Sequence, residues 1–100
     1  MSDRSRRVLF LEPYDGGSHR SFRRGLQAHS RHRIDARTLP PRFWKWRMRG
    51  CAVVLADLIN ASSEPWEVLL ATSYVNTADL RGLLQPPRDR LPLILYFHEN

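Results

Sequence analysis

Cysteine is nearly absent from these 100 residues, because Cys51 is the only one. A single thiol excludes an internal disulfide and the cysteine clusters that hold zinc or iron–sulfur centres. Long apolar runs are missing as well, since none approaches the roughly 20 residues that span a bilayer. The first seven residues are polar and basic with no apolar core behind them, unlike a secretory signal. We therefore expect a cytoplasmic protein with no membrane partner.

Lysine is equally scarce, and the positive charge comes almost entirely from arginine. Fifteen of the sixteen basic residues are Arg, and Lys45 is the exception. Residues 1–49 carry a net charge of +9 and residues 50–100 a net charge of −3. A cationic half favours an anionic partner such as nucleic acid. The alternative is an ordinary solvated surface in which a GC-rich genome has replaced Lys with Arg, and charge alone leaves both interpretations open.

Apolar and amphipathic segments alternate along the chain and predict an α/β domain. Short apolar runs indicate buried strands at residues 8–11, 33–39, 68–72 and 93–97. Helical spacing indicates helices from Ser18 to about Ser30, from Met48 to Ala61, and from an Asn76 cap to Pro86-Pro87. This alternation gives a parallel sheet with right-handed crossovers. We expect a Rossmann-like parallel sheet with strand order 3-2-1-4, in which the exits of the first and fourth strands border one crevice.

Each predicted helix has an apolar stripe that should face the sheet. In the first helix the stripe comprises Phe22, Gly25, Leu26 and His29. In the second it comprises Met48, Cys51, Ala52, Leu55, Leu58 and Ile59, and in the third Leu80, Leu83 and Leu84.

The chain is expected to form a single, incomplete domain. Residues 1–7 are interpreted as a flexible basic tail and residues 8–100 as the domain. No helix follows the fourth strand, although doubly wound sheets need helices on both faces. We therefore expect apolar surface to be exposed near residues 93–97, where a further segment should pack.

The segment from Glu12 to His19, Glu-Pro-Tyr-Asp-Gly-Gly-Ser-His, follows the first strand. Gly16 and Gly17 would let backbone N–H groups approach a ligand closely, and a helix start favours an anion or a sugar oxygen. His19 could hydrogen-bond a group that lies over the glycines. The motif is neither G-x-G-x-x-G nor a Walker loop, which argues against NAD and ATP. The alternative is a tight turn with a capping Ser18 and a surface histidine.

His98 and Glu99 leave the fourth strand at the same predicted crevice. The imidazole of His98 could bond a sugar hydroxyl or stabilise charge at a reacting centre. Glu99 would point elsewhere, because neighbouring side chains of an extended segment alternate in direction. The alternative is a pair of solvated polar residues.

An aromatic-basic stretch, Phe-Trp-Lys-Trp-Arg at residues 43–47, precedes the second predicted helix. Aromatics interleaved with cations suit stacking on bases or sugars beside phosphate contacts. The alternative is a loop whose tryptophans fill the core beneath that helix.

Four motifs in this order resemble one family. They are Glu12–His19, Leu39–Arg47, Ala71–Leu80 and Leu95–Asn100, and they span nearly the whole chain from Val8. Together they resemble the tRNA-queuosine α-mannosyltransferases, the family of glycosyltransferase-like domain-containing protein 1. The resemblance implies the N-terminal half of a retaining GT-B glycosyltransferase, which has two Rossmann-like domains with the active site between them. It also implies transfer of mannose from GDP-mannose to the cyclopentenediol of queuosine in tRNA, with no metal ion or other cofactor.

The resemblance also implies roles for particular residues. His98 matches a histidine that contacts the donor sugar near its anomeric carbon in related enzymes, so His98 and Glu99 are the catalytic candidates. The substrate-binding candidates are Tyr14, Gly16, Gly17, Ser18, His19 and Asn100. The tRNA-binding candidates are Trp44, Lys45, Trp46 and Arg47. A second domain, absent from this chain, would hold most of the nucleotide sugar, so the chain alone is expected to be inactive.

Two other functions stay open at the level of sequence. A non-enzymatic RNA-binding α/β module would account for the cationic first half and the aromatic-basic stretch. A flavodoxin-like domain for a small ligand is the other, although the chain has no phosphate loop rich in Ser and Thr.

Overall fold

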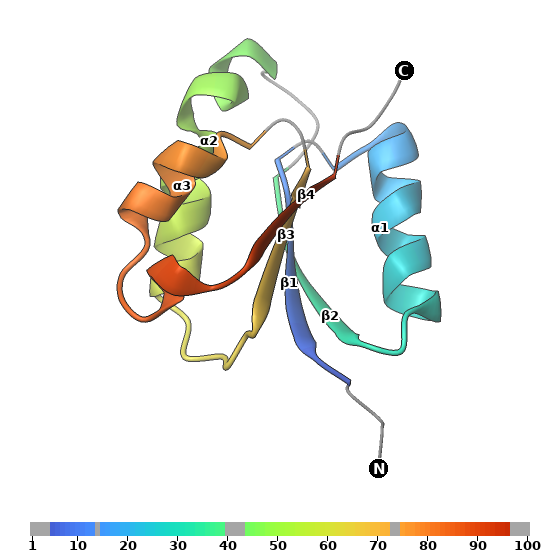
Figure 1. Cartoon of the computed structure of the whole chain (residues 1–100). Coiled ribbons are helices and arrows are strands. Elements are labelled where there is room, and N and C mark those ends of the chain that lie inside the picture. Colours follow the sequence, from blue (N-terminus) through green and yellow to red (C-terminus); the bar gives the residue numbers. More distant parts are fainter. Residues whose placement is uncertain (1–4, 14, 40–43, 73–74, 97–100) are drawn as a thin grey trace.

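A computed structural model describes residues 5–13, 15–39, 44–72 and 75–96, with side chains in the second helix from Cys51 onward (Figure 1). In these ranges one parallel sheet contains β1 (Arg7–Glu12), β2 (Arg33–Thr38), β3 (Val68–Thr72) and β4 (Leu93–Tyr96). The connections contain α1 (Gly17–His29), α2 (Trp44–Asn60), α3 (Thr77–Leu83) and a 3-10 turn, η1 (Arg88–Arg90). The predicted α/β class is confirmed, and the strands begin and end within one residue of their expected bounds.

The strand order is β2-β1-β3-β4, so the predicted order 3-2-1-4 is wrong. β1 pairs with both β2 and β3, and β3 separates β1 from β4. The chain moves outward from β1 to β2 through α1 and then returns past β1 to β3 through α2. Because crossovers between parallel strands are right-handed as a rule, this reversal of direction is expected to place α1 and α2 on opposite faces of the sheet. Figure 1 shows α1 on one face and α2 with α3 on the other.

The main hydrophobic core lies between the sheet and the α2–α3 layer. Cys51, Leu55 and Ile59 of α2 are buried there, as predicted. Leu58 was also expected in this core, but it is 40% exposed. It lies on the flank of the buried stripe, because successive residues of a helix are about 100° apart.

The short helix α3 shows the same pattern. The Asn76 side chain accepts a hydrogen bond from the Asp79 N–H, which confirms the predicted cap. Leu80 and the following Leu84 are buried, whereas Leu83, which was also predicted to face the core, is 44% exposed. Leu83 therefore lies at the edge of the stripe rather than within it.

The helix α1 turns His19, Phe22 and Leu26 toward the sheet. His19 is buried, while Phe22 and Leu26 are half-buried. The predicted stripe is therefore wrong at its far end, where His29 is exposed. His19 occupies the sheet-facing position one turn before Phe22. A pattern of apolar residues does not include a histidine at this position. Ser18 is also not the cap: Gly16 is, and Ser18 lies exposed within the first turn.

Residues 44–47 of the aromatic-basic stretch form the start of α2 and are not a loop, because the helix begins at Trp44. Its Trp, Lys and Arg residues tolerate helical backbone well, and the single Gly50 is too weak a breaker to delay the helix. The side chains of residues 44–50 lie outside the described part of the structure. No helix in the described part of the chain is long and apolar enough to cross a membrane.

The α1 face of the sheet is open above β4. Ile94 is 56% exposed and Tyr96 is 38% exposed, which confirms the predicted apolar surface at the fourth strand. On this face a groove of about 450 Å³ lies among Leu26, Leu70 and Ile94 and reaches Arg6. Because Arg6 precedes β1, the groove extends toward the amino edge of the sheet, away from the predicted site.

Candidate functional site

The strand order creates a topological switch point between β1 and β3. The chain leaves β1 toward α1 on one face and leaves β3 toward α3 on the other (Figure 1). In doubly wound sheets, ligands bind outside the carboxyl ends of the strands at such a point. The candidate site therefore lies at the ends of β1 and β3 and not, as predicted, beside the first and fourth strands.

Three buried polar side chains meet at this switch point. Glu12 ends β1, Thr72 ends β3 and His19 lies in the first turn of α1, with exposed fractions of 0%, 0% and 5% respectively. His19 Nδ1 lies 3.0 Å from Glu12 Oε1, and the Thr72 hydroxyl donates to Glu12 Oε2 over 3.3 Å. Burial of a carboxylate is costly unless hydrogen bonds compensate for the lost water. These two contacts therefore help to keep Glu12 in the interior.

Backbone hydrogen bonds hold the segments that follow the strands. The Leu39 N–H donates to the Glu12 carbonyl over 3.0 Å, and the Asp15 N–H donates to the Leu39 carbonyl over the same distance. Beyond β3, the Val75 N–H donates to the Thr72 carbonyl over 3.1 Å. The first two bonds extend the pairing of β1 and β2 past the ends of the strands, so Glu12 has a fixed backbone.

Asp15 ties the β1–α1 turn to the helix. Its carboxylate accepts hydrogen bonds from Arg23 Nε and Nη2 at 2.8 and 2.9 Å, and its carbonyl accepts one from Arg20 at 2.8 Å. Burial raises the pKa of Asp15, but the hydrogen bonds from Arg23 and the charges of Arg23 and Arg20 outweigh it, so the pKa lies below its usual value. Asp15 therefore links the turn to α1 through hydrogen bonds and ion pairs with Arg20 and Arg23.

Gly16 and Gly17 form the predicted turn between β1 and α1. Gly16 is extended, with φ −156°, and Gly17 has a left-handed φ of 53°. A Cβ on Gly17 would meet no atom within 4 Å, so backbone conformation, and not crowding, favours glycine at this position. The N–H groups of His19 and Arg20 donate to the Gly16 carbonyl over 3.1 and 3.3 Å, and this start of α1 lies at the carboxyl edge of the sheet.

α1 also contacts the end of β4, where the Phe22 ring stacks on Tyr96 with centroids 4.3 Å apart and planes 9° apart. The ends of β1 and β4 are two strand spacings, about 10 Å, apart at the same edge. His19, one turn before Phe22, is therefore brought toward the exit of β4. The predicted site residues Tyr14, His98, Glu99 and Asn100 lie outside the described residues, as do the side chains of Trp44, Lys45, Trp46 and Arg47.

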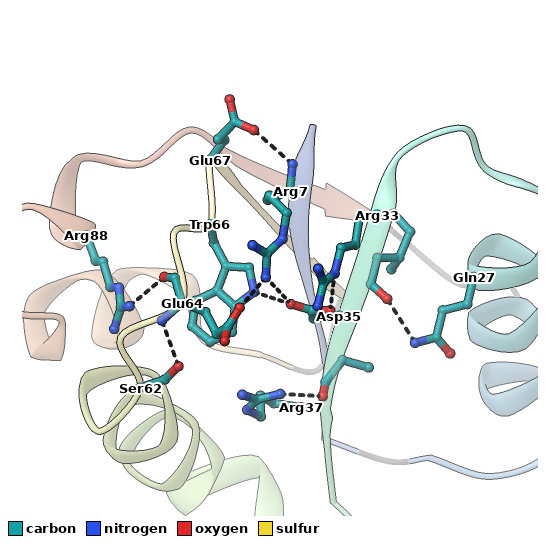
Figure 2. Close-up of polar contacts among 12 residues, drawn as sticks. Arg7, Gln27, Arg33, Asp35, Arg37, Ser62, Glu64, Trp66, Glu67 and Arg88 are labelled. Carbon is teal, nitrogen blue, oxygen red and sulfur yellow. Dashed lines mark hydrogen bonds and ion pairs between the residues drawn. The ribbon is translucent and has the colours of Figure 1, made fainter. Parts of the chain in front are cut away.

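Figure 2 shows a second polar cluster, which lies toward the amino edge of the sheet. Arg7 donates to Asp35 over 3.0 Å, and the Trp66 indole N–H donates to the same oxygen over 2.8 Å. The guanidinium groups of Arg37 and Arg88 each lie 5.1 Å from the Trp66 ring centroid. Burial raises the pKa of Asp35, but the hydrogen bonds from Trp66 and Arg7 outweigh it and keep the pKa low. These groups bind one another and join β1, β2 and the segment before β3, which indicates a structural role.

Sequence patterns indicated Gly16, Gly17 and His19 but not Glu12 or Thr72. The signal that could have identified both is a polar residue at the carboxyl end of an apolar run, since Glu12 follows Val-Leu-Phe-Leu and Thr72 follows Val-Leu-Leu-Ala. Among the described residues, no group of three His, Cys, Asp or Glu side chains could hold a metal ion.

Comparison with known proteins identifies the family. Residues 7–100 match a family model described as tRNA-queuosine alpha-mannosyltransferase N-terminal. The chain belongs to this family. The resemblance based on the Glu12–His19 and Leu95–Asn100 motifs is thereby confirmed. The tRNA-queuosine alpha-mannosyltransferase of Drosophila melanogaster is 36% identical to the chain over 94 residues.

The alignment with the fly mannosyltransferase covers 93% of this chain and 24% of the relative. The chain therefore spans about a quarter of the relative's length. No solved structure matches the chain. The family assignment thus depends on sequence, while the two-domain GT-B arrangement stays a prediction.

Proposed function

We propose that the protein to which this chain belongs transfers mannose from GDP-mannose to queuosine in tRNA, with retention at the anomeric carbon. The observation that carries this proposal is the family match over residues 7–100. The bond between mannose C1 and the diphosphate oxygen breaks, and C1 bonds to a hydroxyl oxygen of the acceptor. The hydroxyl proton leaves with the diphosphate, and the sugar passes through an oxocarbenium-like transition state.

This chain would serve as the acceptor-side domain of a GT-B enzyme, which works in the cytoplasm without a metal ion or other cofactor. Alignment of the chain with 24% of its relative leaves room for a second domain that holds the nucleotide sugar. The carboxyl edge of the sheet would face that domain, because the switch point and the start of α1 lie there. Gly16, Gly17, Ser18 and His19 at this edge would bind substrate, together with Tyr14 and Asn100.

His98 would contact the mannose near C1, with Glu99 beside it as the second catalytic candidate. His98 follows Tyr96, the last described residue of β4, by two positions in the sequence. The stacking of Phe22 on Tyr96 supports this role, because it holds the end of β4 against the helix that carries His19.

The test is an assay of the full-length protein with GDP-mannose and tRNA that contains queuosine, in which mannosylated nucleoside is quantified by mass spectrometry. We expect His98→Ala to lower kcat by about 100-fold or more, the loss typical of a group that stabilises developing charge. Exposed His29 at the end of α1 supplies the control, and His29→Ala should keep wild-type turnover. Unchanged turnover in His98→Ala would remove His98 from the mechanism, and a wild-type protein that transfers no mannose would refute the proposed reaction.

A second candidate function is RNA binding without catalysis. The observation that favours it is the net charge of +9 on residues 1–49. In both proposals the tRNA would contact Trp44, Lys45, Trp46 and Arg47 at the start of α2. The two differ in the assay above, since a pure binding module would retain tRNA tightly, with steep salt dependence, but form no product.

A further inference from the structure

Glu12 is a fully buried carboxylate that the transfer reaction outlined above does not use. It is the last residue of β1, and the residues before it, Val8 to Leu11, are all buried and apolar. A neutral side chain at this position would cost less to remove from water. A buried carboxylate, by contrast, is an acceptor strong enough to determine how its hydrogen-bond partner is protonated and oriented.

That partner is His19, whose Nδ1 lies 3.0 Å from Glu12 Oε1. An ionised carboxylate only accepts hydrogen bonds, so the proton of this bond belongs to Nδ1. In a neutral ring the other nitrogen, Nε2, is then an acceptor. The second carboxylate oxygen accepts from the Thr72 hydroxyl over 3.3 Å, which keeps the carboxylate from rotating away from the imidazole. A carboxylate that is hydrogen-bonded to one nitrogen of a histidine also fixes the orientation of the ring.

We propose that Glu12 is a positioning residue, which holds His19 so that Nε2 accepts a hydrogen bond from a hydroxyl group of the substrate at the switch point. Because the two nitrogens of an imidazole direct their bonds away from each other, the bond from Nε2 would point away from the Glu12 carboxylate. The hydroxyl belongs to a ring with several such groups, either the sugar of the donor or the diol of the acceptor. This inference rests on the proposed function, because it assigns Glu12 and His19 to the substrate site of that reaction.

The local charges favour a hydroxyl over a phosphate. A helix start alone would attract an anion, but Glu12 and Asp15 already place two carboxylates beside the first turn of α1. The positive groups that face them, Arg20 and Arg23, are bound to Asp15. A neutral imidazole backed by a carboxylate offers an acceptor lone pair to O–H donors and repels anions.

Nuclear magnetic resonance of the chain with ¹⁵N-labelled histidine tests the protonation directly. We expect the wild-type His19 ring, assigned by its loss in His19→Gln, to carry its proton on Nδ1 and to leave Nε2 unprotonated near neutral pH. In Glu12→Gln the carboxamide can donate as well as accept, so the proportion of the Nδ1–H form should fall. Asp15→Asn is the matched control, because it removes another buried carboxylate of the same turn and should leave the His19 tautomer unchanged.

Several results would overturn the inference. A wild-type ring with its proton on Nε2 would show that Glu12 does not set the tautomer. A ring protonated on both nitrogens across the pH range of stability would make Nε2 a donor and not an acceptor. An Nδ1–H proportion that does not change in Glu12→Gln, or that changes equally in Asp15→Asn, would also count against it. If Glu12→Gln does not fold, the wild-type spectrum alone still shows which ring nitrogens of His19 are protonated. Thr72→Val then provides a milder variant, in which the Nδ1–H proportion should fall by a smaller amount.

Kinetics of the full-length enzyme give the second readout and identify the hydroxyl. We expect Glu12→Gln to raise KM about tenfold for one substrate, with a smaller change in kcat, since a positioned hydrogen bond is worth about one decade in binding. A higher KM for tRNA would show that the bound hydroxyl belongs to the acceptor diol. A higher KM for GDP-mannose would show that it belongs to the donor sugar. Equal losses for both substrates, or a loss in kcat alone, would contradict the assignment. Absence of any transfer by the wild type would refute the proposed reaction but not the tautomer, which is measured independently.

Discussion

At the scale of single residues, Asp15 shows how one charged contact can hold the turn at the candidate site. The hydrogen bonds from Arg23 and the charges of Arg23 and Arg20 keep its pKa below the value of about 3.9 expected in an unfolded chain, although burial opposes them. A carboxyl whose pKa is depressed by folding stabilises the folded state above its unfolded pKa. That stabilisation is lost as the pH falls through the folded pKa.

We therefore expect the free energy of unfolding to decrease as the pH is lowered below about 4, with part of the decrease due to Asp15. Asp15→Asn should cost about 2 kcal/mol at pH 7, where two charge-assisted hydrogen bonds are lost. It should cost less as the pH falls through the folded pKa, because the wild-type carboxyl then becomes protonated. Urea unfolding of both proteins at several pH values measures this, and a difference that stays constant with pH would contradict the prediction.

The residues of the site differ in how far sequence could identify them. Gly16, Gly17 and His19 are close in the sequence, so the local sequence is enough to predict that they form a polar turn together. The contact between His19 and Glu12 depends on how α1 folds back over the end of β1. The contact between Glu12 and Thr72 joins strands that are 60 residues apart. Such contacts depend on strand pairing, which a local pattern does not encode.

At the scale of elements, α1 contains two glycines in different environments, Gly17 with φ 53° and Gly25 in the middle of the helix. Neither would bring a Cβ within 4 Å of another atom, so substitution tests backbone conformation without steric overlap. Gly17→Ala should lower the free energy of unfolding by about 1 kcal/mol, because a left-handed conformation is unfavourable for L-residues. Gly25→Ala should raise it by about 0.5 kcal/mol through lower backbone entropy in the unfolded chain. Chemical denaturation compares the two, and changes of the same sign would contradict this reading of the turn.

The elements themselves were largely predictable, but their arrangement was not. Short apolar runs located the strands within one residue because burial on both faces leaves a continuous apolar pattern. The start of α2 at Trp44 was missed because an aromatic-basic stretch has no helical stripe of its own. Whether the third strand pairs with the first or the second depends on the packing of α2 against the sheet. Both orders satisfy right-handed crossovers, so the pattern alone could not choose between them.

At the scale of the whole molecule, the side of the sheet that α1 covers is rich in basic residues. Between Asp15 and Asp35 the chain carries five arginines and no acidic residue, in a segment that contains α1. Exposed acidic residues such as Asp57 and Asp79 belong to α2 and α3, on the opposite face (Figure 1). An RNA backbone would therefore be attracted to the α1 side, in addition to the basic start of α2 that contains the tRNA-binding candidates.

The basic residues on the α1 side predict a specific effect on tRNA binding. Arg24 and Arg31 are exposed on the α1 side, whereas Arg90 is exposed in η1, which follows α3 in the chain. We expect Arg24→Glu and Arg31→Glu each to weaken tRNA binding several-fold and to reduce the slope of log affinity against log salt by about 1, the loss of one phosphate contact. Arg90→Glu makes the same change in net charge and should have little effect on either quantity. Fluorescence anisotropy at several salt concentrations measures both. An equal effect from all three variants would show that tRNA responds to net charge alone, and the α1 face would then have no special part in its binding.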